Sequence, residues 1–127
     1  MRIQYSPEFD RRLDTFYSYI RDELKSPQSA VTNANRILDQ CSLLAIMPRM
    51  GAEIHTEDGI GTGIRMLFLE NHVALYRISE DFIEIVTLLD ARTKEFTEIL
   101  KEIRTGVFDQ GLGKKRGEGD TRAPRGQ

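Results

Sequence analysis

The sequence has few of the residues that would bring covalent or metal chemistry. Of its 127 residues, one is a cysteine (Cys41), two are histidines (His55 and His72) and none is a tryptophan. A single cysteine cannot form an internal disulfide, and Cys41 falls on the apolar stripe of a predicted helix, where a thiol packs as a small apolar group. Neither histidine has a cysteine or carboxylate at ligand spacing, so we predict no metal site and no cofactor.

Long apolar runs and a strong net charge are also missing. No stretch approaches the roughly 20 apolar residues of a membrane-spanning helix, and the start lacks the basic-then-apolar pattern of a signal peptide. These absences favour a cytoplasmic protein without membrane contact. The net charge is −2, and residues 1–105 carry 13 Lys and Arg against 17 Asp and Glu. A nucleic acid would therefore have to bind a local basic cluster against an acidic background.

Three predicted β-strands form the centre of the chain. Each is rich in β-branched and aromatic residues, and they span residues 64–69, 72–78 and 82–89. The connections are short, which forces antiparallel neighbours and predicts a meander. In the first connection, Glu70-Asn71, we expect Asn71 to take the positive φ that a two-residue hairpin needs.

Two Ser-Pro pairs mark helix starts, Ser6-Pro7 and Ser26-Pro27. Serine is a good N-cap and proline suits the first helical position. Apolar residues then recur at spacings of three and four, which predicts a first helix ending near Lys25 and a second ending near Met47. Pro48 cannot continue the second helix. With almost no linker between them, the two helices form an αα-hairpin.

The remaining segments complete an α+β domain. Residues 1–5 predict a first strand, and residues 51–63 predict a loop with a short extended piece at 52–55. A last amphipathic helix runs to about Arg104. The predicted order is β-α-α-β-β-β-α, an antiparallel sheet with the helical hairpin on one face. From residue 106 the composition is rich in glycine and charge, so we predict a domain over 1–105 and a flexible tail over 106–127.

Three arginines stand out in or beside the meander: Arg65, Arg77 and Arg92. An arginine among apolar strand residues either extends from an edge to solvent or faces a functional concavity. Each interpretation has about equal weight for one arginine alone. A cluster of all three would suit phosphate, because guanidinium groups bind phosphate through paired donors.

Several motifs follow one another along the chain: YSPEFDRRLDTFYSYI (5–20), Leu43-Leu44 with Met47-Pro48 and Gly51, Gly63-Ile64-Arg65, HVALYRI (72–78), and Glu84-Ile85-Val86 running into Asp90-Ala91-Arg92. The order of these motifs resembles the RelE/ParE superfamily of toxins from type II toxin–antitoxin modules. The resemblance implies a small cytoplasmic bacterial toxin with a β-α-α-β-β-β core. It also implies a cognate antitoxin, encoded beside the toxin, as partner.

Within the superfamily, RelE-like members cleave mRNA in the ribosomal A site without a metal, and ParE-like members inhibit DNA gyrase without nuclease activity. Attack of a 2′-OH on the next phosphate needs a base, a cation for the phosphorane and an acid for the leaving oxygen. For a RelE-like chain, the resemblance implies the following candidates: Arg65 and Arg92 for the phosphorane, His72 or Asp90 for proton transfer, and Arg77 and Lys94 for RNA binding.

The chain departs from RelE in three ways. Val73 stands where RelE carries an arginine, the late tyrosine of RelE has only Phe96 as its nearest aromatic counterpart, and the acidic balance is unusual for a ribosome-targeting member. Our first expectation is a ribosome-dependent mRNA endoribonuclease, with the ribosome and mRNA as its targets. The alternatives are a gyrase inhibitor and a degenerate, non-toxic family member.

Overall fold

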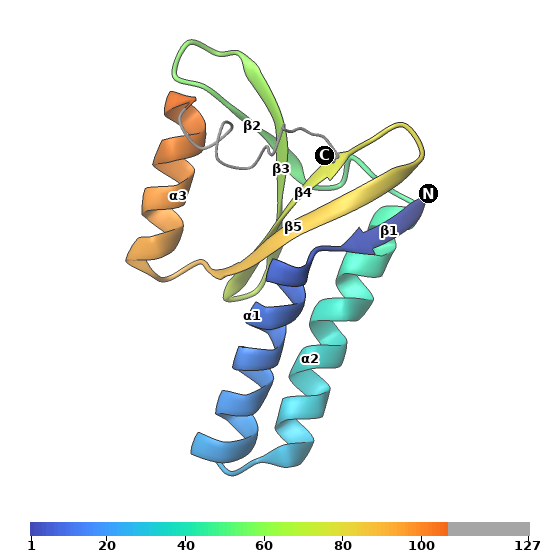
Figure 1. Cartoon of the computed structure of the whole chain (residues 1–127), viewed down its shortest axis with the longest axis vertical. Coiled ribbons are helices and arrows are strands. Elements are labelled where there is room, and N and C mark those ends of the chain that lie inside the picture. Colours follow the sequence, from blue (N-terminus) through green and yellow to red (C-terminus); the bar gives the residue numbers. More distant parts are fainter. Residues whose placement is uncertain (107–127) are drawn as a thin grey trace. The chain divides into compact units, whose positions relative to one another are not determined.

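The computed structural model describes residues 1–106 (Figure 1). By its internal contacts, the chain forms two compact units. The main unit comprises Met1–Ala52 and Arg65–Arg92, and the second unit comprises Glu53–Ile64 and the chain from Thr93 onward. Residues 107–127, which hold nearly all of the predicted tail, lie outside the described part. No helix within the described part is long and apolar enough to cross a membrane.

The fold is α+β, as predicted, with five strands in one sheet. The strands are β1 (Arg2–Tyr5), β2 (Ala52–His55), β3 (Gly61–Leu69), β4 (His72–Ile78) and β5 (Phe82–Asp90). Their hydrogen-bonded order is β1-β5-β4-β3-β2. The meander of β3, β4 and β5 is as expected, but the extended piece at 52–55 is a true strand and adds one to the predicted order.

The predicted antiparallel sheet is confirmed, with one parallel pair at its edge, where β1 pairs with β5. Parallel neighbours need a connection of a dozen or more residues, and the long segment between β1 and β5 supplies it. The turn between β3 and β4 also differs. Its positive φ, 65°, belongs to Glu70 and not to Asn71. A positive φ at the first turn position is a feature of type II′ hairpins.

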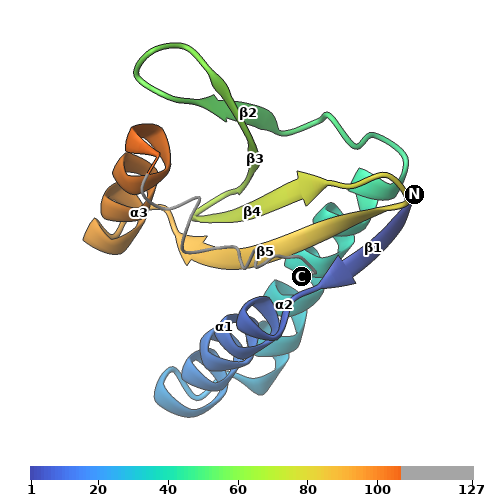
Figure 2. The same cartoon turned by 45° about the horizontal axis from the view of Figure 1, so that its top comes forward.

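The helical hairpin lies on one face of the sheet (Figure 2). Helix α1 spans Pro7–Ser18 and continues as a π-helix over Tyr19–Glu23, and α2 spans Pro27–Ser42 and ends in a 3-10 turn over Leu43–Ala45. When the π-helix and the 3-10 turn are included, the two helical segments end close to the predicted positions, Lys25 and Met47. The last turn of each segment is not α-helical. Lys25 itself takes a positive φ of 52°, which reverses the chain between the helices.

The core of the main unit lies between this hairpin and the sheet. It consists of Phe9, Ile37, Cys41, Leu44, Leu67, Leu69, Ala74, Tyr76, Ile83, Ile85 and Leu88. Cys41 is fully buried there, as its place on the apolar stripe predicts. Because fully burying a large apolar side chain contributes about 1.5–3 kcal/mol, these contacts hold the helices on the sheet.

A β-bulge in β5 makes this core possible. Leu75 pairs with Thr87 and Tyr76 pairs with Ile85, so Val86 has no partner on β4. One extra residue shifts the alternation of side chains by one position. For this reason Ile85 and Leu88, three residues apart, both reach the helix-facing core.

Ser6 connects the bulge to helix α1. Its backbone N–H donates to the carbonyl of Ile85 at 3.0 Å, and its hydroxyl donates to the carbonyl of Val86. The same hydroxyl accepts the backbone N–H of Phe9 at 3.0 Å and so caps α1. One serine therefore fixes the start of a helix and two carbonyls of the bulge.

The second unit contains a hairpin tip and helix α3 (Lys94–Thr105). The hydroxyl of Thr62 donates to the carbonyl of Ile54 at 2.7 Å across the hairpin, and the N–H of Glu57 donates to the carbonyl of Arg104 at 3.2 Å. Thr93 caps the start of α3, and Gly106, at φ 88°, ends it in the left-handed conformation that favours glycine.

The two Ser-Pro starts provide a matched test of the role of Ser6. Ser26 is the N-cap of α2 but makes no side-chain capping bond. Replacing Ser6 by alanine removes a cap and a bond to the bulge, so we expect Ser6→Ala to lower the free energy of unfolding by about 1–3 kcal/mol. Ser26→Ala is expected to change it by less than about 0.5 kcal/mol. Urea denaturation measures both, and equal losses in the two variants would contradict this role.

Candidate functional site

Three of the predicted site residues meet where β4 begins and β5 ends. His72 is the register partner of Asp90. Arg92 donates to Asp90 through its Nε at 3.0 Å, through a terminal nitrogen at 2.8 Å, and through its backbone N–H at 2.9 Å. The carboxylate of Asp90 thus holds both the side chain and the backbone of Arg92. Three of the four candidate catalytic residues, His72, Asp90 and Arg92, therefore lie together in space.

The bulge in β5 aims Asp90 toward the helices. Beyond Val86 the alternation is shifted, so Asp90 shares its face with Leu88, which belongs to the helix-facing core. His72 lies on the same face by alternation with Ala74, and its ring stands edge-on to Phe16 of α1 at 4.4 Å between centroids. A regular strand would turn Asp90 to the opposite face, away from His72.

Helix α2 contributes two polar residues that sequence reasoning did not select. Arg36 donates to Glu70 at 2.7 Å and to the side-chain oxygen of Asn33 at 2.8 Å. A cavity of about 70 Å³ is lined by Phe16, Asn33, Arg36, Ile37, Leu69, Glu70, Asn71, His72 and Arg92. Only the spacing of three between Asn33 and Arg36, which places them on one side of a helix, was visible in the sequence.

The protonation states follow from these contacts. The hydrogen bonds from Arg92 hold the pKa of Asp90 at about 2, below its ordinary value of 3.8, and the same pairing raises the pKa of Arg92. Burial lowers the pKa of His72 below 6.5, because it disfavours the charged imidazolium, although Asp90 acts in the opposite direction. At neutral pH the cluster therefore holds a neutral imidazole beside a carboxylate–guanidinium pair.

Arg65 lies apart from this cluster. It precedes Leu69, the end of β3, by four residues, which corresponds to about 13 Å along the strand. Its Nε donates to the carbonyl of Gly51 at 2.9 Å and a terminal nitrogen donates to the carbonyl of Arg49 at 3.3 Å. These bonds give Arg65 a structural role, holding the loop that follows α2.

Tyr76 holds the same loop from the core. Its hydroxyl donates to the carbonyl of Pro48 at 2.7 Å and accepts the N–H of Gly51 at 2.9 Å. Gly51 has no room for a side chain, since a Cβ there would lie 2.5 Å from the carbonyl oxygen of Met66. The Pro48–Gly51 loop is therefore anchored by Tyr76, by Arg65 and by close packing on β3.

The two predicted RNA-binding residues also have acidic neighbours. Arg77 donates to Glu84, its register partner on β5, at 3.0 Å. Lys94 belongs to the second unit, is largely exposed, and has Glu98 at 3.8 Å one helical turn along α3. The described residues hold no group of three or more His, Cys, Asp or Glu side chains arranged for a metal ion.

The pairing of Asp90 with Arg92 predicts a pH-dependent contribution to stability. A carboxyl group whose pKa is lowered by folding stabilises the fold fully above its unfolded value near 3.8 and loses that contribution as the pH falls toward 2. We expect Asp90→Asn to be less stable than the wild-type chain at pH 7, with the difference shrinking between pH 4 and pH 2.5. Urea denaturation across this range measures it, and a difference independent of pH would contradict the assignment.

Comparisons with known proteins place the chain in a family. The sequence model of the family described as the ParE toxin of type II toxin-antitoxin system, parDE, matches residues 3–95. A search of curated proteins gives no match. Among solved structures, the chain is similar to one from the "Chromosomal ParDE TA system from P. aeruginosa", with a TM-score of 0.60, 22% identity, and coverage of 72% of this chain and 97% of that chain. At this identity, the structural likeness establishes the shared fold. Because the family pattern extends over most of its length, this chain belongs to the ParE toxin family of type II toxin–antitoxin systems.

Proposed function

We propose that this chain is a toxin that inhibits DNA gyrase by binding it, and that it does not cleave RNA. Membership of the ParE family supports this proposal first, because ParE-like toxins, as the sequence resemblance implies, act on gyrase. The main observation in favour of gyrase inhibition over RNA cleavage is that the arginines available for phosphate binding already form ion pairs. The guanidinium groups of Arg36, Arg77 and Arg92 each meet a carboxylate of the chain itself.

These pairs oppose phosphate binding. A phosphorane needs donors aimed at it before the reaction, whereas the donors of Arg92 are aimed at Asp90 from two nitrogens. An RNA phosphate would have to displace that carboxylate and leave it charged beside the phosphate. Arg65, the other predicted phosphorane ligand, donates to backbone carbonyls at a distance from the cluster. Within the described residues, these pairings argue against a preorganised site for the transition state of RNA cleavage.

The charge of the chain agrees with a protein target. Residues 1–105 have four more acidic than basic side chains, and binding a nucleic acid depends on neutralising several phosphates with Lys and Arg. A protein partner needs no such excess, since interfaces depend on a few well-packed anchors and complementary local charge.

One observation favours RNA cleavage as the second candidate. His72 is neutral at pH 7 and lies beside Arg92 and Arg36 around one small cavity, which would suit a base near two cations. In that case Asp90 must release Arg92 when RNA binds. Arg92→Ala would then lower the cleavage rate by about 10²–10³, with folding retained because the side chain is mostly exposed.

One experiment distinguishes the two functions by testing the same purified chain for inhibition of gyrase and for cleavage of mRNA. We expect the chain to inhibit ATP-dependent supercoiling of relaxed plasmid by purified gyrase, and to leave a reporter mRNA intact in a purified translation system. Supercoiling is read by gel mobility and mRNA cleavage by primer extension.

The purified product of the neighbouring antitoxin gene serves as the control. Added in equimolar amount, it should restore supercoiling, because a type II antitoxin neutralises its toxin by binding it. Cleaved mRNA together with unaffected supercoiling would overturn the proposal and favour the second candidate.

A further inference from the structure

All four methionines of the chain gather in one region of the main unit. They are Met1, Met47, Met50 and Met66, and the first three are 45%, 50% and 39% exposed. The amino group of Met1 donates to the carbonyl of Ala45 at 2.7 Å, and the N–H of Met50 donates to the carbonyl of Met47 at 3.1 Å. Methionines from three separate parts of the sequence therefore meet around the C-terminal end of α2 and the neighbouring part of β3.

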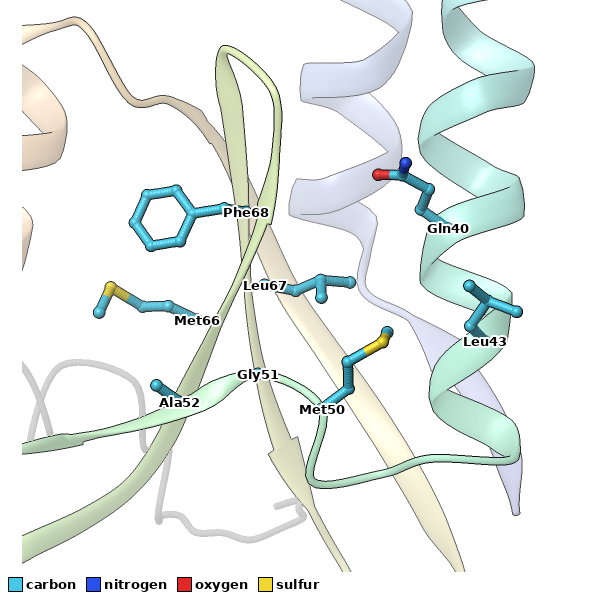
Figure 3. Close-up of a pocket in the computed structure, with 8 residues that line it drawn as sticks. All are labelled: Gln40, Leu43, Met50, Gly51, Ala52, Met66, Leu67 and Phe68. Carbon is cyan, nitrogen blue, oxygen red and sulfur yellow. The ribbon is translucent and has the colours of Figure 1, made fainter.

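These methionines belong to an apolar surface. Met50 and Met66 line a groove of about 490 Å³ between the end of α2 and β3. Figure 3 shows Met50 between β3 and α2, and Met66 on the opposite side of the strand. None of the lining residues carries a charge, and Gln40 is the one with a polar side chain. Since Leu43 and Ile46 are also exposed here, the surface has the apolar character of a protein-binding site.

The cysteine of the chain is not a competing site of oxidation. Cys41 is fully buried, and burial raises the pKa of its thiol to about 12. The thiol therefore keeps its proton at neutral pH, whereas oxidation of cysteine depends on an accessible thiolate. The thioether of methionine needs no deprotonation. The exposed methionines are thus the sulfur groups that an oxidant in solution meets first.

We propose that this methionine surface is an oxidation site that regulates binding of the cognate antitoxin, and that conversion of Met47, Met50 or Met66 to the sulfoxide weakens the complex. The antitoxin is the partner to which family membership points, because the family is the toxin half of a two-protein system. The inference rests on that membership and not on gyrase as the target. Failure of gyrase inhibition would leave it standing.

The oxidant is a peroxide. The methionine sulfur attacks one oxygen of hydrogen peroxide, a sulfur–oxygen bond forms, the oxygen–oxygen bond breaks, and the second oxygen leaves as water with both protons. Sulfur loses two electrons and the peroxide gains them. A methionine sulfoxide reductase reverses the step with a dithiol, whose two thiols become a disulfide while the sulfoxide oxygen leaves as water.

A sulfoxide changes what the surface can bind. It replaces an apolar thioether by a polar group, and a hydrogen-bond acceptor that is buried without a donor opposes binding. Gln40 has the one side-chain donor in the lining, and the backbone N–H of Gly51 already donates to the hydroxyl of Tyr76. A partner that covers the groove with apolar side chains therefore loses affinity when Met50 or Met66 is oxidised.

The test uses the purified full-length chain and the purified product of the neighbouring antitoxin gene. The chain is treated with hydrogen peroxide, catalase removes the peroxide, and the antitoxin is added only afterwards, so that it never meets the oxidant. We expect peptide mass spectrometry to find one added oxygen on each of Met47, Met50 and Met66, with Cys41 unmodified. Titration calorimetry should show a Kd raised by about tenfold or more.

The matched control is the triple variant Met47→Leu, Met50→Leu and Met66→Leu. Leucine keeps the surface apolar at a similar volume and cannot form a sulfoxide. The untreated variant should bind within about threefold of the wild-type chain, and peroxide should no longer raise its Kd. Met1 remains in this variant and can still be oxidised, so a loss of affinity caused by oxidation elsewhere would persist. Circular dichroism confirms folding before and after treatment.

A second measurement needs no mutation. Incubation of the oxidised wild-type chain with a methionine sulfoxide reductase and dithiothreitol should return the Kd to that of the untreated chain. Equal affinity of oxidised and untreated chains, or a loss that persists in the triple variant, would overturn the proposal. Oxidation that abolishes gyrase inhibition and leaves antitoxin binding intact would also overturn it, and would assign the methionines to the gyrase interface.

Discussion

The hydrogen bonds of Ser6 are the constraint on which most of the main unit depends. Its hydroxyl caps α1 and satisfies the carbonyl of Val86, and its N–H satisfies the carbonyl of Ile85. A bulge leaves backbone groups outside the regular ladder, and leaving a buried group unpaired costs about 1–3 kcal/mol. Because Ser6 supplies those partners, the irregular strand is compatible with a close-packed helix. The position of α1 against the sheet and the direction of the side chains after Val86 then follow together.

Much of the fold was predictable because its signals are local. The strand 72–78 was predicted with its observed bounds, and both helix starts follow from a serine followed by a proline. The errors in the predicted fold arise where contacts between residues far apart in the sequence determine the structure. The sequence cannot show that Ser6 forms a capping bond and Ser26 does not, since the difference lies in what each hydroxyl meets. The parallel pairing of β1 with β5 likewise depends on the direction in which the chain re-enters the sheet, and not on residues 1–5 themselves.

The candidate site was predictable in composition but not in arrangement. His72, Asp90 and Arg92 meet because the extra residue Val86 reverses the alternation of β5, and no residue in the strand marks a bulge in advance. Strict alternation would have placed Asp90 on the other face. Arg36 was missed for a related reason. It is a polar residue on an amphipathic helix, and such residues ordinarily face solvent. Only the packing of the helical hairpin on the sheet brings it to the end of β3 and to Glu70.

The contacts of Arg65 also shape the apolar groove between the end of α2 and β3. Arg65 has the position in β3 that suggested a phosphate ligand, yet its donors hold the carbonyls of Arg49 and Gly51, and this fixes Met50 beside Leu67. A guanidinium that donates to backbone carbonyls in this way holds a loop in place and does not serve mainly as a surface charge. Polar groups that satisfy one another, next to apolar groups that remain exposed, are the arrangement expected of a chain that recognises proteins. Binding RNA would instead require cations that stay available to phosphate.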